Sequence, residues 1–192
     1  DNESVSYLIS ELKIDKNIIY NQDFLNLNLS KLFENNNFSI IGNFPYNISS
    51  QILFKVFENK NQIPEIVGMF QKEVAERIVC KQGKAKGILS VLLQAFYDIE
   101  YCFTVNENVF IPPPKVKSGV LKFKRNNRKT LSVDENKFKK IVKLAFNQRR
   151  KKLRNSLKSF VLVQKREIED LLHLRAEQLS VDDFIKVTNH VR

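Results

Sequence analysis

The sequence predicts an α/β fold followed by a small, all-helical domain. Two apolar runs, residues 38–41 and 66–70, have the length of buried strands, and each leads into an amphipathic helical pattern. After a polar linker at residues 126–130 the pattern is helical throughout. We therefore expect an α/β domain over residues 1–125 and helices over residues 126–192.

The other elements follow from the spacing of apolar residues. Further helices are expected over residues 3–12, 72–79 and 88–97, with another that begins at a capping Ser49 or Ser50. Further strands are expected over residues 18–20, 99–105 and 116–124. In the C-terminal part, the expected helices have these apolar faces: Phe138, Ile141, Val142 and Ala145; Leu153, Leu157, Phe160 and Val161 within 149–162; Ile168, Leu171 and Leu172; and Phe184, Ile185 and Val187 after a Ser180 cap.

Positive charge is concentrated in the C-terminal third. The 192 residues carry a net charge of +11. Residues 1–125 hold 15 Lys and Arg against 13 Asp and Glu, whereas residues 126–192 hold 17 against 8. A basic appendage on a nearly neutral domain indicates a polyanionic partner, most often nucleic acid. The alternative is a solubilising surface without a ligand.

Composition also argues against several classes. No stretch reaches 18 apolar residues, so we expect no membrane span. The two cysteines, Cys80 and Cys102, form no metal-binding or disulfide pattern, which fits a reduced cytoplasmic setting. The polar start of the chain is unlike a signal peptide.

The loop after the strand at residues 38–41 carries the most informative residues. Asn43-Phe44-Pro45-Tyr46 leaves the carboxyl end of that strand, where open α/β sheets bind ligands. Asn43 offers an amide, Pro45 stiffens the loop, and Tyr46 offers a face on which a base can stack. Such a site suits a planar ring with an exocyclic amine. The alternative is an ordinary strand-to-helix turn.

Asp23-Phe24 is a second candidate, at the end of the short strand expected at 18–20. The carboxylate can accept a hydrogen bond from an adenine amine while the ring stacks on the base. An aspartate in this position is, however, more often a turn or cap residue.

Four strings together resemble the ribosomal RNA adenine dimethyltransferases, in their small-subunit branch. The Asn-Phe-Pro-Tyr loop is of the type found in amino-group methyltransferases. The strings cover residues 43–50, 70–77, 109–118 and 145–157, and they stand in the family's order and at similar spacings. The resemblance implies a Rossmann-like, S-adenosylmethionine-dependent methyltransferase sheet. It further implies dimethylation of the N6 amino groups of two adjacent adenosines in the 3′-terminal hairpin of small-subunit (16S) ribosomal RNA, and a role in small-subunit biogenesis.

The resemblance also assigns residues. Asp23, Phe24 and Asn43 would bind the cofactor, with Asp1 beside the glutamate that holds its ribose. Asn43 and the backbone carbonyl of Phe44 or Pro45 would bind the target amine, while Tyr46 and Phe110 would hold the extruded base. The basic string would bind RNA, the candidates being Arg149, Arg150, Lys151, Lys152, Arg154 and Lys115. The small ribosomal subunit is the implied partner of a monomeric protein, and no metal is implied.

Three alternatives remain at this point. One is the large-subunit, erythromycin-resistance-type dimethyltransferase, which shares the chemistry but acts on another RNA. The second is a non-catalytic RNA-binding or ribosome-assembly factor on a methyltransferase scaffold. A DNA adenine methyltransferase is disfavoured because the C-terminal helices do not look like a target-recognition domain.

None of the five glycines stands in the glycine-rich turn that usually opens a dinucleotide or S-adenosylmethionine site. We therefore expect an N-terminally incomplete chain in which the first strand and this turn are missing. Isothermal titration should accordingly show weak or absent S-adenosylmethionine binding by these 192 residues, and they should not turn over. Tight binding would contradict this expectation.

Overall fold

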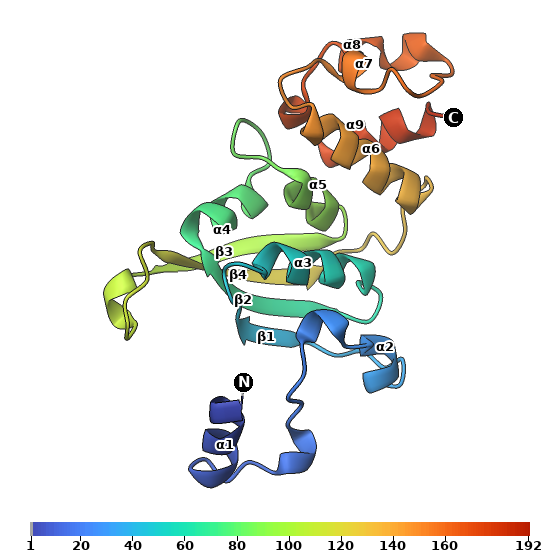
Figure 1. Ribbon diagram of the computed structural model, residues 1–192. Helices are drawn as coiled ribbons and strands as arrows, with labels where there is room; N and C mark the ends of the chain where they lie inside the picture. The colour runs from blue at the N-terminus through green and yellow to red at the C-terminus, as the bar shows by residue number, and fades with distance from the viewer. Residues whose placement is uncertain (1) are drawn as a thin grey trace. The chain divides into compact units, whose positions relative to one another are not determined.

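The computed structural model describes residues 2–192, which divide between Asn36 and Asn37 into two compact units (Figure 1). The first unit contains helix α1 (Asn2–Ser10), two 3-10 turns, η1 (Lys16–Ile18) and η2 (Phe24–Asn26), and the short helix α2 (Leu29–Leu32). Helix α1 confirms the prediction for residues 3–12, with bounds that differ by one or two residues at each end.

The prediction of a strand at residues 18–20 is wrong. Ile18 ends turn η1, whose N-cap Asp15 accepts a hydrogen bond from the Asn17 backbone N–H at 2.9 Å. Ile18 and Tyr20 are both exposed. Local capping by Asp15 thus forms a turn in place of the predicted strand.

The second unit is built on a sheet of four strands among the described residues: β1 (Ile40–Asn43), β2 (Glu65–Gln71), β3 (Tyr97–Val105) and β4 (Ser118–Arg125). The spatial order is β1-β2-β4-β3. Strands β1 and β2 are parallel, and β4 is antiparallel to both of its neighbours. All four strands overlap predicted ones. Their inner face is fully buried at Ile66, Phe70, Leu121 and Phe123.

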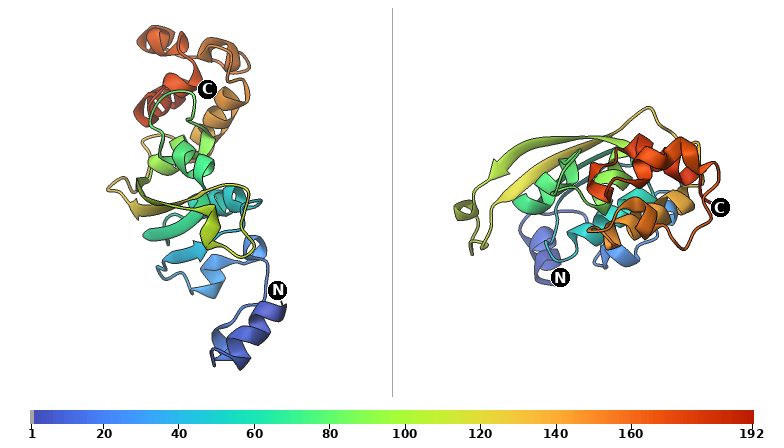
Figure 2. Two further views of the ribbon diagram at one scale, coloured as in Figure 1. Left: turned by 90° about the vertical axis from the view of Figure 1, so that its left-hand side faces the viewer. Right: turned by 90° about the horizontal axis from the view of Figure 1, so that it is seen from above.

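Helices α3 (Ser49–Glu58), α4 (Lys72–Val79) and α5 (Ile88–Gln94) lie over one face of this sheet (Figures 1 and 2). Helix α4 has the predicted bounds, whereas α5 ends earlier than expected and Tyr97 already belongs to β3. Because α3 connects two parallel neighbours, β1 and β2 form a βαβ unit that brings their carboxyl ends to one edge of the sheet.

The ring of Phe44 fixes the start of the loop that leaves β1. Gly42 and Gly68 lie opposite each other in the β1–β2 register, and Phe44 packs over both. A Cβ atom would come within 2.7 Å of the Phe44 ring at Gly42 and within 2.5 Å at Gly68. The ring also contacts Phe70, with 5.3 Å between centroids. The two glycines therefore create the space that buries Phe44.

Helix α6 (Glu135–Asn147) is the longest helix of the C-terminal part, and it buries Phe138, Ile141, Val142, Ala145 and Phe146. This confirms its predicted apolar face. It packs against α5 and against α9 (Val181–Asn189). The α9 N-cap is Ser180, as predicted, in a reciprocal pair of hydrogen bonds with Asp183.

The prediction of a long helix over residues 149–162 is wrong. Only α7 (Leu153–Ser156) is helical there, followed by η4 (Lys165–Ile168), α8 (Glu169–Leu172) and η5 (Ala176–Gln178). Lys152 instead bridges to Arg175, and Leu162 bridges to Val191. Pairing with distant backbone thus overrides local helical spacing. Leu153 and Leu157 are buried as expected, but Val161 is 67% exposed.

Lys60 links the sheet region to α6. Its ammonium lies 2.7 Å from a Glu135 carboxylate oxygen, and it sits over the rings of Phe57 and Phe96, 5.2 and 4.7 Å from their centroids. The residue is only 8% exposed. A buried cation with one carboxylate and two aromatic faces joins α6 to the end of α3.

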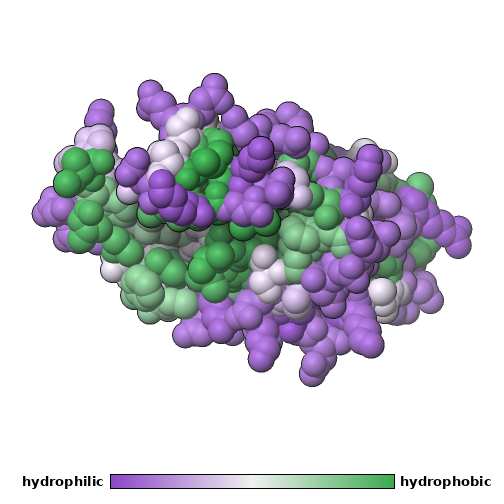
Figure 3. Space-filling view, turned by 90° about the horizontal axis from the view of Figure 1, so that it is seen from below, coloured by the Kyte–Doolittle hydropathy of each residue, from purple (hydrophilic) through white to green (hydrophobic). Residues whose placement is uncertain are grey.

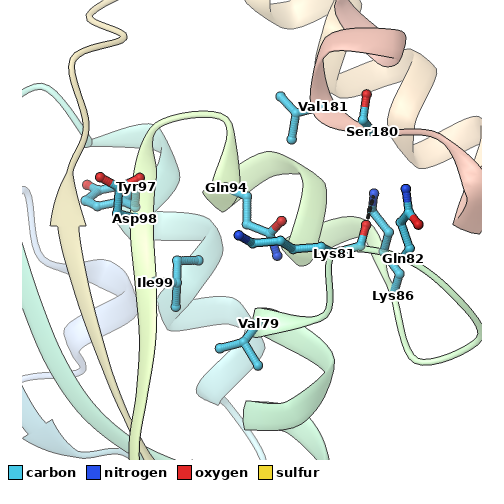
Figure 4. A pocket seen from close by; sticks show the side chains of 10 residues that line it. All are labelled: Val79, Lys81, Gln82, Lys86, Gln94, Tyr97, Asp98, Ile99, Ser180 and Val181. Atoms are coloured by element: carbon cyan, nitrogen blue, oxygen red, sulfur yellow. Dashed lines mark hydrogen bonds between the residues drawn. The ribbon is translucent and has the colours of Figure 1, made fainter.

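The loop at residues 81–87 is also attached to the C-terminal helices. The buried Lys86 ammonium donates to the carbonyls of Lys81, at 2.8 Å, and Leu179, and burial lowers its pKa from the usual value. Gly83 N–H donates to the Glu177 carbonyl at 3.1 Å. Beside this attachment lies a pocket of about 660 Å³, lined by Lys81 and Gln82 of the loop and by Ser180 and Val181 at the start of α9 (Figure 4). The loop is therefore held against the C-terminal helices by hydrogen bonds.

Some apolar side chains stay open to solvent. Ile41, on the edge strand β1, is 85% exposed, and Tyr7 in the first unit is 56% exposed. Figure 3 shows one face on which apolar side chains gather among hydrophilic ones. Of the described residues, no helix combines the length and the apolar character needed to cross a membrane.

Gly68→Ala should destabilise the protein by roughly 1–3 kcal/mol, because its methyl group overlaps the Phe44 ring and forces the core to shift. Urea unfolding measures this change. The matched test repeats Gly68→Ala in a Phe44→Leu background, where the cost should be smaller because the ring is gone. An equal cost in both backgrounds would contradict the proposed overlap.

Lys60→Ala should lower the free energy of unfolding by about 2 kcal/mol, because it leaves the partly buried Glu135 carboxylate without its cation. Lys124→Ala, at an exposed position on β4, is the matched control and should change stability by less than about 0.5 kcal/mol. Equal effects of the two substitutions in urea unfolding would refute the role of this buried pair.

Candidate active site

The loop after β1 forms a tight, anchored turn into α3. Ile48 N–H donates to the Pro45 carbonyl at 3.2 Å, and the Ser49 hydroxyl donates to the Tyr46 carbonyl at 3.1 Å. Ser49 is the first helical residue and Ile48 occupies the N-cap without a side-chain bond, so capping by Ser49 or Ser50 is wrong. The serine hydroxyl instead holds the turn that carries Tyr46.

Tyr46 is tied to a strand 72 residues away. Its hydroxyl lies 2.5 Å from the hydroxyl oxygen of Ser118, the first residue of β4. Ser118 is fully buried and pairs in register with Gln71, at the carboxyl end of β2. This contact fixes the phenol at the edge of the sheet where β1 and β2 end. Sequence reasoning missed Ser118 as a site residue, although it ends the string at residues 109–118.

The structure brings the β1 loop and Phe110 together. One open pocket of about 330 Å³ is lined by Asn43, Phe44, Pro45, Tyr46, Phe110, Pro112 and Pro114. Asn43 and Pro45 are exposed at its rim, and Tyr46 is half-buried. Phe44 differs from its neighbours because its ring is buried in the core. Its backbone is therefore the part that can serve the pocket. The volume and the aromatic walls suit a planar ring the size of a nucleobase.

Phe110 follows turn η3 (Glu107–Val109), whose N-cap is Asn106. Its N–H donates to the Glu107 carbonyl at 3.3 Å. The three prolines that follow restrict the backbone, so the segment that crosses the pocket is stiff. Lys115, just beyond them, is exposed.

Asp23 is the N-cap of turn η2 in the first unit. One carboxylate oxygen accepts from Leu25 N–H at 2.8 Å, and the other accepts from the Asn26 amide at 3.1 Å. The capping role considered for Asp23 is therefore present. Phe24 is half-buried. Asp1, the other expected cofactor residue, lies outside the described residues.

The basic string does not form a continuous helix. Four of its predicted RNA-binding side chains are exposed: Arg150, Lys151, Lys152 and Arg154. Arg149 differs, because its guanidinium lies 3.7 Å from a Glu177 oxygen and also donates to the Lys84 carbonyl. Arg149 thus joins the loop at residues 81–87 to η5. Within residues 2–192 no cluster of three His, Cys, Asp or Glu side chains is arranged to hold a metal ion.

Comparison with known structures shows the same fold in two transferases. A dimethyladenosine transferase from Plasmodium falciparum superposes with a TM-score of 0.73 at 22% identity, over 90% of this chain and 73% of that one. The 23S rRNA methyltransferase ErmE superposes with a TM-score of 0.69 at 19% identity, over 98% of this chain and 77% of that one. At such identities the likeness establishes the Rossmann-like fold alone.

Comparison of sequences is more specific. The family model for ribosomal RNA adenine dimethylase matches residues 3–192. Proteins named ribosomal RNA small subunit methyltransferase A are 56% identical in Flavobacterium johnsoniae, over all of this chain and 74% of that protein, and 56% identical in Cytophaga hutchinsonii, over 98% and 73%. These names support the small-subunit methyltransferase over the large-subunit enzyme and the assembly factor. The chain therefore belongs to the ribosomal RNA adenine dimethylase family, a family of adenine dimethyltransferases that modify ribosomal RNA.

Proposed function

We propose that the full-length protein dimethylates the N6 amino groups of two adjacent adenosines in the 3′-terminal hairpin of small-subunit ribosomal RNA, with S-adenosylmethionine as methyl donor. The observation that carries the proposal is the pocket that joins the Asn43–Tyr46 loop to Phe110. Membership of the family supports the reaction, and the pocket supports the residues that would perform it.

The pocket offers acceptors for an exocyclic amine. The lone pair of such an amine is delocalised into the ring, so the amine is a weak nucleophile until its hydrogens are held in a geometry that localises the lone pair. The Asn43 side-chain oxygen and a backbone carbonyl can accept these hydrogens. Pro45 O is already bound by Ile48 N–H in the turn, so we assign the second acceptor to the Phe44 carbonyl.

The aromatic walls would hold the extruded base. Tyr46 and Phe110 both line the pocket, and stacking on such rings contributes roughly 1–3 kcal/mol per base. Tyr46 is held at both ends. Its ring hydroxyl contacts the Ser118 hydroxyl, and its backbone carbonyl accepts from the Ser49 hydroxyl. A fixed ring places the amine in a constant position, and catalysis by positioning requires this. The same pocket must also accept the monomethylated amine for the second transfer.

We propose that the Asp23 carboxylate binds the adenine of the cofactor. Its two hydrogen bonds, to Leu25 and Asn26, use about half of the acceptor positions of a carboxylate, so an exocyclic amine can still bind. We propose that Phe24 stacks on the same ring and that Asn43 lies beside the donor. A cofactor-binding role for Asp1 is proposed from the family resemblance alone. When bound, S-adenosylmethionine supplies an electrophilic methyl group.

The helical domain, residues 126–192, is proposed to bind ribosomal RNA. Support comes from the four exposed cations Arg150, Lys151, Lys152 and Arg154, which can bind phosphates and would give a steep dependence of binding on salt. Lys115 would contact RNA beside the pocket. We further propose a monomer that acts on the small subunit in the cytoplasm.

Methyl transfer from labelled S-adenosylmethionine into small ribosomal subunits, by the natural full-length protein, tests the proposal. Asn43→Ala should lower kcat by about 100-fold or more, because it removes an acceptor that acts on the reacting amine. Tyr46→Ala should raise KM for the subunit and lower kcat, because the base is no longer held. The outcome that supports the target is two methyl groups on each of two adjacent adenosines.

Asn47→Ala is the matched control, because Asn47 is an exposed asparagine of the same loop that does not line the pocket. It should leave kcat and KM close to wild type. Equal losses in Asn43→Ala and Asn47→Ala would show that the loop tolerates no change and would remove the argument for a specific acceptor. Absence of any transfer by the wild-type protein would refute the proposed function.

A further inference from the structure

The outer face of α6 carries a row of lysines that the basic string at residues 149–154 does not include. Asn136, Lys139, Lys140, Lys143, Leu144 and Asn147 line a shallow hollow of about 370 Å³. Their spacing of three and four residues places them on one face of the helix, opposite the buried face that contains Ile141 and Ala145. The hollow runs along 12 residues of α6, from Asn136 to Asn147, about 16 Å of helix.

The lysines differ in how their charge is used. Lys139 lies 2.6 Å from a Glu58 oxygen, so its charge is balanced within the protein. Lys143 sits over the Phe54 ring, 4.9 Å from its centroid, and Lys140 sits over the Phe160 ring at 5.4 Å. The ion pairs of the described chain include neither Lys140 nor Lys143. Aromatic faces therefore position these two ammonium groups without neutralising them.

The two ammonium groups lean to opposite sides of the helix. Phe54 belongs to α3, whereas Phe160 follows α7, so Lys143 and Lys140 flank the hollow from two directions. Leu144 lies in the hollow, and Asn136 and Asn147 contribute amides toward its two ends. A shallow hollow with two ammonium groups and an amide toward each end matches a chain of phosphates, because each phosphate oxygen can accept from an ammonium or an amide.

We propose that this face of α6 is a second RNA-binding surface, which holds the phosphate backbone of ribosomal RNA through Lys140 and Lys143. The inference rests on the proposed function and extends it, because the basic string and the pocket loop do not contain these residues. The surface contacts phosphates and carries no base-reading group of its own, so it contributes affinity and register and leaves the choice of adenosine to the pocket.

The test is binding of small ribosomal subunits and of protein-free small-subunit RNA over a range of salt concentrations. Lys140→Gln/Lys143→Gln should weaken binding to both by about tenfold at 0.1 M salt and lower the slope of log K against log salt by roughly 2. The matched control, Lys124→Gln/Lys16→Gln, removes the same charge from exposed positions on β4 and η1, outside the helical domain. It should keep the wild-type slope. Urea unfolding establishes that both variants are folded.

Lys140→Arg/Lys143→Arg keeps the charge and should retain wild-type binding, so it separates loss of charge from loss of structure. Equal slopes for the glutamine variant and its control would overturn the proposal, and so would loss of binding in the arginine variant. Weaker binding to intact subunits with unchanged binding to protein-free RNA would also overturn it, since the surface would then take a ribosomal protein. Failure of the wild-type protein to bind or methylate RNA would overturn the proposed function as well.

Discussion

The burial of one phenylalanine ring is the constraint on which the site depends. Phe44 fills the space left by Gly42 and Gly68 and packs against Phe70, so the chain leaves β1 along a single path. The residues on either side, Asn43 and Pro45, consequently face solvent at the rim of the pocket. A loop that presents polar groups for catalysis needs such an anchor, because a flexible loop would hold its hydrogen-bond acceptors in variable positions.

Sheet topology explains why distant segments meet at this loop. Strands β1 and β2 are parallel, so both end at the same edge, and β4 starts there because it is antiparallel to β2. Ser118 therefore lies within reach of Tyr46 across the end of β2, and the segment that precedes it in the chain brings Phe110 and the prolines to the same edge. The contact between the Tyr46 and Ser118 hydroxyls thus ties the β1 loop to the start of β4, the strand that follows the Phe110 segment.

Prediction from the sequence succeeded where apolar spacing and a local cap agree, as for α6 and the Ser180 cap of α9. It failed where other contacts dominate: Asp15 caps a turn in place of the strand at 18–20, and Lys152 and Leu162 pair with distant backbone in place of a helix. The loop at 43–46 and Phe110 could be named from their motifs. The burial of Phe44 and the role of Ser118 could not, because both follow from which strands lie side by side.

Net charge alone does not show which cations of the C-terminal part are free to bind a polyanion. Among the cations of this region, Arg128 pairs with Asp182, Lys139 with Glu58, and Arg149 with Glu177. Each of these pairs joins two separate segments of the chain, and the charge of its cation is already balanced within the protein. A phosphate backbone gains most from cations that have no carboxylate partner to lose, since breaking an existing pair offsets the new contact. The partners of each lysine and arginine, read from the structure, therefore separate the cations that hold the helices in place from those that remain free for a polyanion.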